Sequence, residues 1–152
     1  VIPVDSAQSM LEAVLQHSIR ADALIMAAAV ADYRPATASE QKIKKSDDDL
    51  TLTLARNPDI LMQVKEMPKR PRVVIGFAAE SENLLANAQG KLERKGLDLL
   101  VANDISATDA GFESDNNRVV ILSKDGTQMP VDLRSKADIA LFLIDLLFQQ
   151  LM

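Results

Sequence analysis

Residues 23–45 read ALIMAAAVADYRPATASEQKIKK, and this stretch decides the fold of the chain. Its first eight residues, 23–30, are uniformly apolar, which is typical of a parallel strand that is covered on both faces. A carboxylate, Asp32, comes just after that strand, and a lysine-rich run follows at residues 42–45. Because ligands in open α/β sheets bind beyond the carboxyl ends of the strands, we expect a site where this strand ends.

Strands and helices alternate to either side of this stretch. The helix expected after Ser6 has its apolar side chains on one face, at Met10, Leu11, Val14, Leu15 and Ile19. Single strands are predicted at residues 1–4, 23–30, 50–54, 73–78 and 97–102. A hairpin is predicted at residues 119–122 and 128–133, because Asp125-Gly126 lies between two alternating runs.

Helix boundaries are marked by capping residues. Asn57 is a predicted N-cap with Pro58 in the first helical position, and that helix should end by Pro68. Gly96 should end a helix that begins near Asn83, and Ser135 with Asp138 resembles a capping box before a helix that runs to the end of the sequence. The pattern predicts one domain over residues 1–152, a three-layer Rossmann-like or ribokinase-like α/β fold. Its sheet is expected to be mostly parallel with an antiparallel C-terminal hairpin.

Composition excludes several classes of function. The formal net charge of -5 argues against a nucleic-acid-binding surface, which needs clustered positive charge. With no cysteine there is no disulfide or thiolate metal site, and His17 alone cannot build a histidine-rich one. No apolar run is long enough to span a membrane. These features predict a cytoplasmic protein.

Each candidate site residue has a structural alternative. The small side chains of residues 27–29 would let a flat ring approach the backbone, or would only let a helix pack closely. Asp32 would accept hydrogen bonds from a ribose or hold a metal ion, or would cap a turn. The amides at the Asn57 helix start would bind an anion, and Asp59 would help to hold Mg²⁺ on a triphosphate; every capped helix has such amides.

The lysines also have two interpretations. Lys42, Lys44 and Lys45 are either a phosphate-binding flap or a solvated charge cluster. Lys91 and Lys95 are four residues apart, so they either share a site or form an exposed pair that favours the helix dipole. His17 is expected on the surface. The five glycines form no Gly-x-Gly loop, which counts against an NAD(P)-dependent Rossmann enzyme.

Six motifs together resemble the phosphopantothenoylcysteine synthetase family of coenzyme A biosynthesis, in the bacterial form often fused to a flavin-dependent decarboxylase. They are AAVADYRP at 28–35, KIKK at 42–45, NPDIL at 57–61, GFAAE at 76–80, RKGLDLLVAND at 94–104 and GFESDNN at 111–117. The resemblance implies a cytoplasmic, often dimeric ligase that joins 4'-phosphopantothenate to L-cysteine with CTP and Mg²⁺. The carboxylate attacks the α-phosphate to form an acyl-cytidylate and pyrophosphate, and the cysteine amine then displaces CMP.

The same resemblance assigns roles to individual residues. Lys42 matches the catalytic flap lysine, and the residues that match nucleotide-binding positions are Met26, Ala27, Ala28, Asp32, Asn57, Pro58, Asp59, Ile60, Phe77, Lys91 and Lys95. No metal ligands are assigned. The family also begins with a strand and a glycine-rich loop that this sequence lacks. An alternative is therefore a catalytically incomplete fragment that acts only as a nucleotide-binding or dimerisation module, with pairing edges in the 119–133 hairpin.

Overall fold

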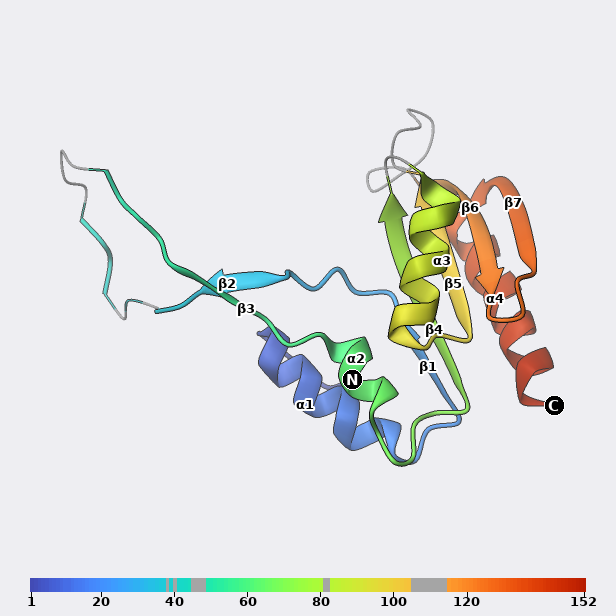
Figure 1. The fold of residues 1–152 in the computed structure, drawn as a ribbon, viewed down its shortest axis with the longest axis horizontal. Helices are drawn as coiled ribbons and strands as arrows, with labels where there is room; N and C mark the ends of the chain where they lie inside the picture. Colours follow the sequence, from blue (N-terminus) through green and yellow to red (C-terminus); the bar gives the residue numbers. More distant parts are fainter. Residues whose placement is uncertain (38, 40, 45–48, 81–82, 105–114) are drawn as a thin grey trace.

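The fold is built on one five-stranded sheet with strand order β1-β4-β5-β6-β7 (Figure 1). The computed structural model describes residues 1–37, 39, 41–44, 49–80, 83–104 and 115–152. Strands β1 (Ala23–Met26), β4 (Val73–Glu80) and β5 (Leu99–Asp104) are parallel, and the hairpin of β6 (Asn116–Ser123) and β7 (Gln128–Ser135) continues the sheet antiparallel. The predicted α/β fold is confirmed.

Helices cover both faces of the sheet, which makes three layers (Figure 1). Helix α4 (Lys136–Leu151) packs on the face that carries Ile75, Val101 and Ile121. Helices α1 (Ala7–Ser18), α2 (Ile60–Lys65) and α3 (Leu84–Lys95) pack on the opposite face, which carries the intervening residues Val74, Leu100 and Leu122. Because side chains alternate along a strand, the continuous apolar runs of β4 and β5 supply both cores.

Most predicted caps are confirmed. Ser6 caps α1 in a capping box with Ser9, and Ser135 accepts a hydrogen bond from the Asp138 amide at the start of α4. Gly96 ends α3 with φ of 61°, a left-handed conformation that costs glycine nothing. His17 is exposed, as expected.

Several predicted boundaries are wrong. Residues 1–4 form no strand, because no described strand pairs with them. The strand predicted at 23–30 ends at Met26, the last residue that pairs with β4, and the strand predicted at 97–102 begins at Leu99 because residues 96–98 form the turn after α3. Ile19 caps α1 from outside the helix and is 58% exposed.

A second, two-stranded sheet projects away from the main sheet (Figure 1). It pairs β2 (Tyr33–Pro35) with β3 (Leu54–Arg56) antiparallel, so the strand predicted at 50–54 lies further along the chain. We call residues 33–56 the arm. Its described residues are exposed except for the half-buried Ala55, so the arm contributes almost nothing to the core.

Within the described residues, no helix combines the length and the apolar content that a membrane-crossing helix needs.

Candidate functional site

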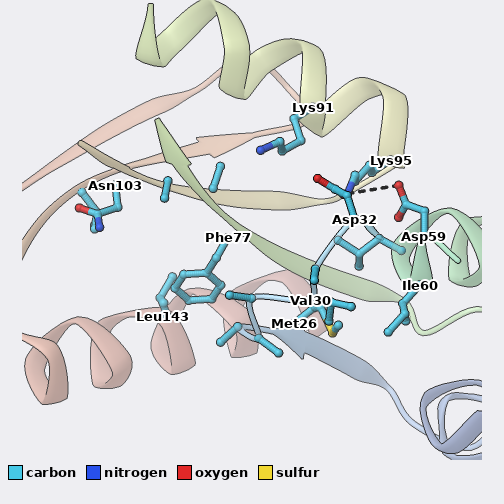
Figure 2. Close-up of a pocket in the computed structure, with 18 of the residues that line it drawn as sticks. Met26, Val30, Asp32, Asp59, Ile60, Phe77, Lys91, Lys95, Asn103 and Leu143 are labelled. Carbon is cyan, nitrogen blue, oxygen red and sulfur yellow. Dashed lines mark ion pairs between the residues drawn. The ribbon is translucent and has the colours of Figure 1, made fainter. Parts of the chain in front are cut away.

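A cavity of about 560 Å³ lies at the carboxyl ends of β1, β4 and β5 (Figure 2). The chain leaves the sheet after Met26, and the departing residues 27–32 form one wall of the cavity. The start of α2 and the last turns of α3 form a second wall, and α4 closes the opposite side with Ile139 and Leu143. This is the edge of the sheet where the sequence predicts a site.

The cavity brings together all but one of the predicted site residues. Its lining includes Met26, Ala27, Ala28, Asp32, Asn57, Pro58, Asp59, Ile60, Phe77, Lys91 and Lys95. Lys42 is the exception, because it lies exposed on the arm and does not line the cavity. Lys45 of the same motif and residues 111–114 of GFESDNN lie outside the described residues.

Asp59 and Lys95 form an ion pair across the cavity wall, with 3.3 Å between Oδ2 and Nζ (Figure 2). The Asp59 carboxylate also caps α2 by accepting a hydrogen bond from the Met62 amide at 3.2 Å. Its negative charge is therefore compensated twice, by a helix start and by an ammonium group. This compensation weakens the repulsion between the Asp59 carboxylate and a bound phosphate.

The prediction that Asn57 caps α2 is wrong, because Asp59 is the N-cap and the helix has six residues. The Asn57 amide donates to the Asp32 carbonyl at 2.8 Å, and its side-chain Nδ2 donates to the Ala31 carbonyl at 2.8 Å. Its Oδ1 accepts from Arg34 at 3.1 Å. Asn57 thus joins the two ends of the arm instead of offering unpaired amides to an anion.

The lining has the charge needed for an anionic ligand. Its charged residues are Asp32, Asp59, Lys91, Lys95 and Lys136, which give a net charge of +1 in a chain whose formal net charge is -5. Lys91 and Lys95 are half-buried and face the cavity from α3, so the alternative of an exposed surface pair is wrong. A partly enclosed positive site attracts anions more strongly than the same charges in water.

An apolar surface lies beside these charges. Ala27, Ala28 and Ala29 are exposed to the cavity and not packed under a helix, which removes the packing alternative for them. The Phe77 ring is 38% exposed and lies in the cavity beside Leu143 of α4 (Figure 2). A planar aromatic group would find both a ring to stack on and accessible backbone groups.

No described residues form a ready-made metal site of three or more His, Asp or Glu side chains. Mg²⁺ commonly binds through one or two carboxylates together with substrate phosphates and water. Asp32 fits that requirement, because its carboxylate lines the cavity and makes no ion pair with a described residue. The cavity therefore suits a metal ion that arrives with a phosphorylated ligand.

Three further polar residues, Asn103, Asn117 and Lys136, line the cavity. Asn103 is expected at this edge because a predicted strand ends beside it, whereas the sequence assigns no role to Asn117 or Lys136. Asn103 is the penultimate residue of β5, and its buried Oδ1 has no hydrogen-bond partner among the described residues. The packing of the hairpin and of α4 on the sheet brings Asn117 and Lys136 to this edge, and the sequence alone does not specify that packing.

The sequence and the fold of this chain are similar to those of known proteins. The family described as "DNA/pantothenate metabolism flavoprotein C-terminal domain" matches residues 1–151. The chain is 46% identical over 138 residues to the coenzyme A biosynthesis bifunctional protein CoaBC of Vibrio vulnificus strain CMCP6, covering 90% of this chain and 34% of that protein. It is 45% identical over 139 residues to CoaBC of Bacillus subtilis strain 168, covering 91% of this chain and 34% of that protein.

Among solved structures, the C-terminal domain of CoaBC superposes with a TM-score of 0.79 at 35% identity, over 99% of this chain and 65% of that one. A mutant of Cab2 in complex with phosphopantothenate-cysteine shares the fold, with a TM-score of 0.65 at 20% identity. The chain spans about a third of the length of the curated relatives that it matches.

Proposed function

Because this chain belongs to the DNA/pantothenate metabolism flavoprotein C-terminal domain family, we propose that it forms the nucleotide site of a phosphopantothenate–cysteine ligase in coenzyme A biosynthesis. The observation that carries the proposal is the cavity, which gathers eleven predicted residues from separate stretches of the sequence. In the proposed reaction 4'-phosphopantothenate and CTP give an acyl-cytidylate and pyrophosphate. The cysteine amine then forms the amide bond and releases CMP.

The lining supports an assignment of the parts of CTP. The cytosine would lie against Phe77 and the backbone of residues 27–29, and Asp32 would accept hydrogen bonds from the ribose or take part in binding Mg²⁺. Lys91 and Lys95 would hold phosphates from α3. Mg²⁺ would arrive with the triphosphate and neutralise part of its charge.

Lys42 is the proposed catalytic residue, and it acts from the arm. Negative charge builds on the α-phosphate and on the leaving pyrophosphate, and an ammonium group placed there stabilises the transition state. Covering the cavity would also keep water from the hydrolysable acyl-cytidylate. Since Lys42 lies outside the cavity in this structure, the proposal requires the arm to bring it in.

The first test is pyrophosphate release from CTP and 4'-phosphopantothenate by the full gene-encoded protein that contains this chain. Lys42→Ala should lower the rate by about 100-fold or more, the cost of removing one transition-state charge partner. Lys44→Ala is the matched control, because Lys44 is equally exposed two residues along the arm, and it should stay within about threefold of the unchanged protein. A Lys42→Ala protein as fast as the control would refute the catalytic assignment.

A homodimer and a fused flavin-dependent decarboxylase are further parts of the proposal. Large apolar side chains stand exposed on the arm, and such surfaces mark association sites. They are Tyr33, Ile43, Leu50, Leu52 and Leu54. Sedimentation velocity tests the dimer: a single monomeric species at all concentrations would contradict it.

The alternative for residues 1–152 alone is a nucleotide-binding or dimerisation module that does not complete ligation. It is favoured by the place of Lys42, outside a cavity that is otherwise assembled. Calorimetry with CTP, ATP and NADH separates the alternatives. Selective CTP binding without turnover supports the module, CTP binding with pyrophosphate release supports the ligase, and a preference for NADH contradicts both.

A further inference from the structure

The arm joins the rest of the domain at the cavity. Asp32, before β2, and Asn57, after β3, line it, whereas the arm between them projects away from the sheet (Figure 1). The direction in which the arm leaves the domain is therefore set within a few residues of the proposed nucleotide site. Any role for Lys42 depends on that direction.

Four hydrogen bonds join the two ends, and we call the residues that make them the root clasp: Ala31, Asp32, Arg34, Arg56 and Asn57. Asn57 donates its amide to the Asp32 carbonyl and its Nδ2 to the Ala31 carbonyl, both at 2.8 Å. Arg34 Nη1 donates to the Arg56 carbonyl at 2.7 Å and to Asn57 Oδ1 at 3.1 Å. One guanidinium group thus ties β2 to β3 and to the cavity wall.

The clasp is the only strong restraint on the arm that the described residues show. The paired strands are short, and beyond them one further bond, from the Ala36 amide to the Thr53 carbonyl at 2.8 Å, holds the ribbon together. The described arm residues are exposed except for the half-buried Ala55. Within a single copy of residues 1–152, the described residues show no packing further out that would correct a change at the root.

The arm amplifies small changes at its root. Lys42 lies eight positions after Arg34, a span of at most about 28 Å in an extended chain. A rotation of about 10° at the root would move the tip by about 5 Å over that span, which is more than a catalytic ammonium group tolerates.

We infer that Arg34 is a positioning residue: through Asn57 it fixes the arm relative to the cavity and so sets how often Lys42 reaches the phosphates. The inference rests on the proposed function, since it assigns Arg34 a part in the same nucleotidyl transfer. Arg34 does not line the cavity, so it has no direct contact with the proposed nucleotide. It acts by holding Asn57, the residue that sequence reasoning placed in direct contact with the nucleotide.

The kinetic test compares Arg34→Met with Arg56→Met in the full gene-encoded protein. Methionine keeps the apolar stem and removes the donors of Arg34. Arg56 is the matched control, because it lies in the same ribbon and only its carbonyl takes part in the clasp. Arg34→Met should lower kcat for pyrophosphate release by about 10-fold or more, with CTP affinity by calorimetry within about threefold. Arg56→Met should change neither, and Arg34→Lys, which keeps one donor group, should recover part of kcat.

A second readout needs no activity. Nitroxide labels at Lys44→Cys and Glu93→Cys, with any cysteine outside residues 1–152 replaced, report the distance from the arm tip to α3. Within residues 1–152 the labels are the only thiols, because the sequence has no cysteine. The distance distribution should broaden with Arg34→Met and stay unchanged with Arg56→Met.

These results separate the two proposals. If the unchanged protein releases no pyrophosphate from CTP, the proposed function fails, and the label distances alone still decide whether Arg34 orients the arm. If Lys42→Ala is inactive while Arg34→Met keeps full kcat and an unchanged distance distribution, the ligase stands and the inference is overturned. A loss of CTP affinity that matches the loss of activity would also overturn it, because Arg34 would then act on binding.

Discussion

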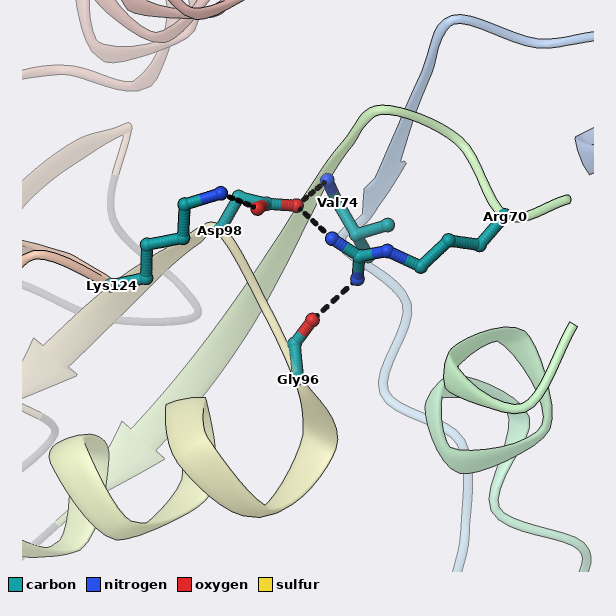
Figure 3. A network of polar contacts seen from close by, with 5 residues as sticks. All are labelled: Arg70, Val74, Gly96, Asp98 and Lys124. Atoms are coloured by element: carbon teal, nitrogen blue, oxygen red, sulfur yellow. Dashed lines mark hydrogen bonds and ion pairs between the residues drawn. The ribbon is translucent and has the colours of Figure 1, made fainter. Parts of the chain in front are cut away.

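A single buried carboxylate, Asp98, organises the end of the sheet that lies opposite the cavity (Figure 3). Its Oδ2 accepts from the Val74 amide at 2.9 Å and from Arg70 at 2.7 Å, and its Oδ1 accepts from Lys124 at 2.7 Å. The side chain is 2% exposed, so each oxygen needs such a partner to offset the cost of losing water. Asp98 thereby joins β4, β5 and the hairpin turn away from the proposed chemistry.

Asp98→Asn is expected to lower the free energy of unfolding by about 2–3 kcal/mol, because it removes two charge-assisted bonds from a buried group. Lys124→Met is the control and should cost less than about 1 kcal/mol, because the Lys124 side chain is 60% exposed. Urea unfolding measures both values. Equal losses for the two variants would contradict the central role of Asp98.

Asp125 makes the hairpin turn sensitive to pH. Hydrogen bonds from the Thr127 amide and then the Thr127 hydroxyl lower the pKa of its carboxyl below 3.8. A lowered pKa in the folded state adds stability above the unfolded value, and this stability is lost as the pH falls through the folded value. Asp125→Asn keeps an acceptor for the Thr127 amide, so its stability should lose this part of the acid dependence and approach that of the unchanged protein as the pH falls below the folded pKa. A parallel pH profile for both proteins would refute this.

Helix α3 and its C-cap provide two glycine positions with opposite requirements. Gly90 is exposed in the helix, and an added Cβ would meet no atom within 4 Å. Gly96 has φ of 61°, and an added Cβ would lie 3.1 Å from the Lys65 side chain. Gly90→Ala should therefore stabilise the protein by about 0.5–1 kcal/mol, whereas Gly96→Ala should destabilise it by about 1–2 kcal/mol. Thermal unfolding of both variants measures the difference, and a shift of the same sign would contradict the α3 geometry.

The sequence predicts which segments form helices and strands, but it does not predict where those helices and strands begin and end. The start of α2 shows why. Asn57, Pro58 and Asp59 are all good helix-start residues, so local propensity cannot rank them. The long-range bonds from Asn57 to Ala31 and Asp32 decide the outcome and leave Asp59 as the cap. Strand ends depend in the same way on where a partner strand stops pairing, which a single sequence does not state.

At the scale of the molecule, the arm lies outside the hydrophobic core and contributes almost nothing to it. Replacing residues 37–52 by Asn-Gly would keep the bond between Ala36 and Thr53 in a two-residue hairpin. The midpoint of thermal unfolding should then change by less than about 3 °C, because the described arm residues are exposed. Pyrophosphate release should fall at least as far as in Lys42→Ala. A drop of about 10 °C or more would show that the arm supports the core.

The place of the candidate site was predictable because parallel strands end at one edge, so Asp32, Phe77 and Asn103 had to meet there. The contribution of α4 was not, because its packing on that edge follows from the order of strands in the sheet. The position of Lys42 outside the cavity was not predictable either, because the number of residues between two strands does not fix the direction of the arm that joins them.

The two borders of the main sheet differ in chemistry. At one border β7 carries Pro130, which has no N–H to offer, together with the exposed charges of Asp132 and Arg134. At the other border β1 has the sequence Ala-Leu-Ile-Met, and no described strand pairs with its outer edge. The unpaired edge of β1 can pair with an extended peptide, whereas the proline and the charged side chains of β7 oppose such pairing. Residues 1–152 in isolation would therefore tend to associate through the exposed edge of β1. Ile25→Lys should reduce that association, because a charged side chain on an edge strand opposes pairing.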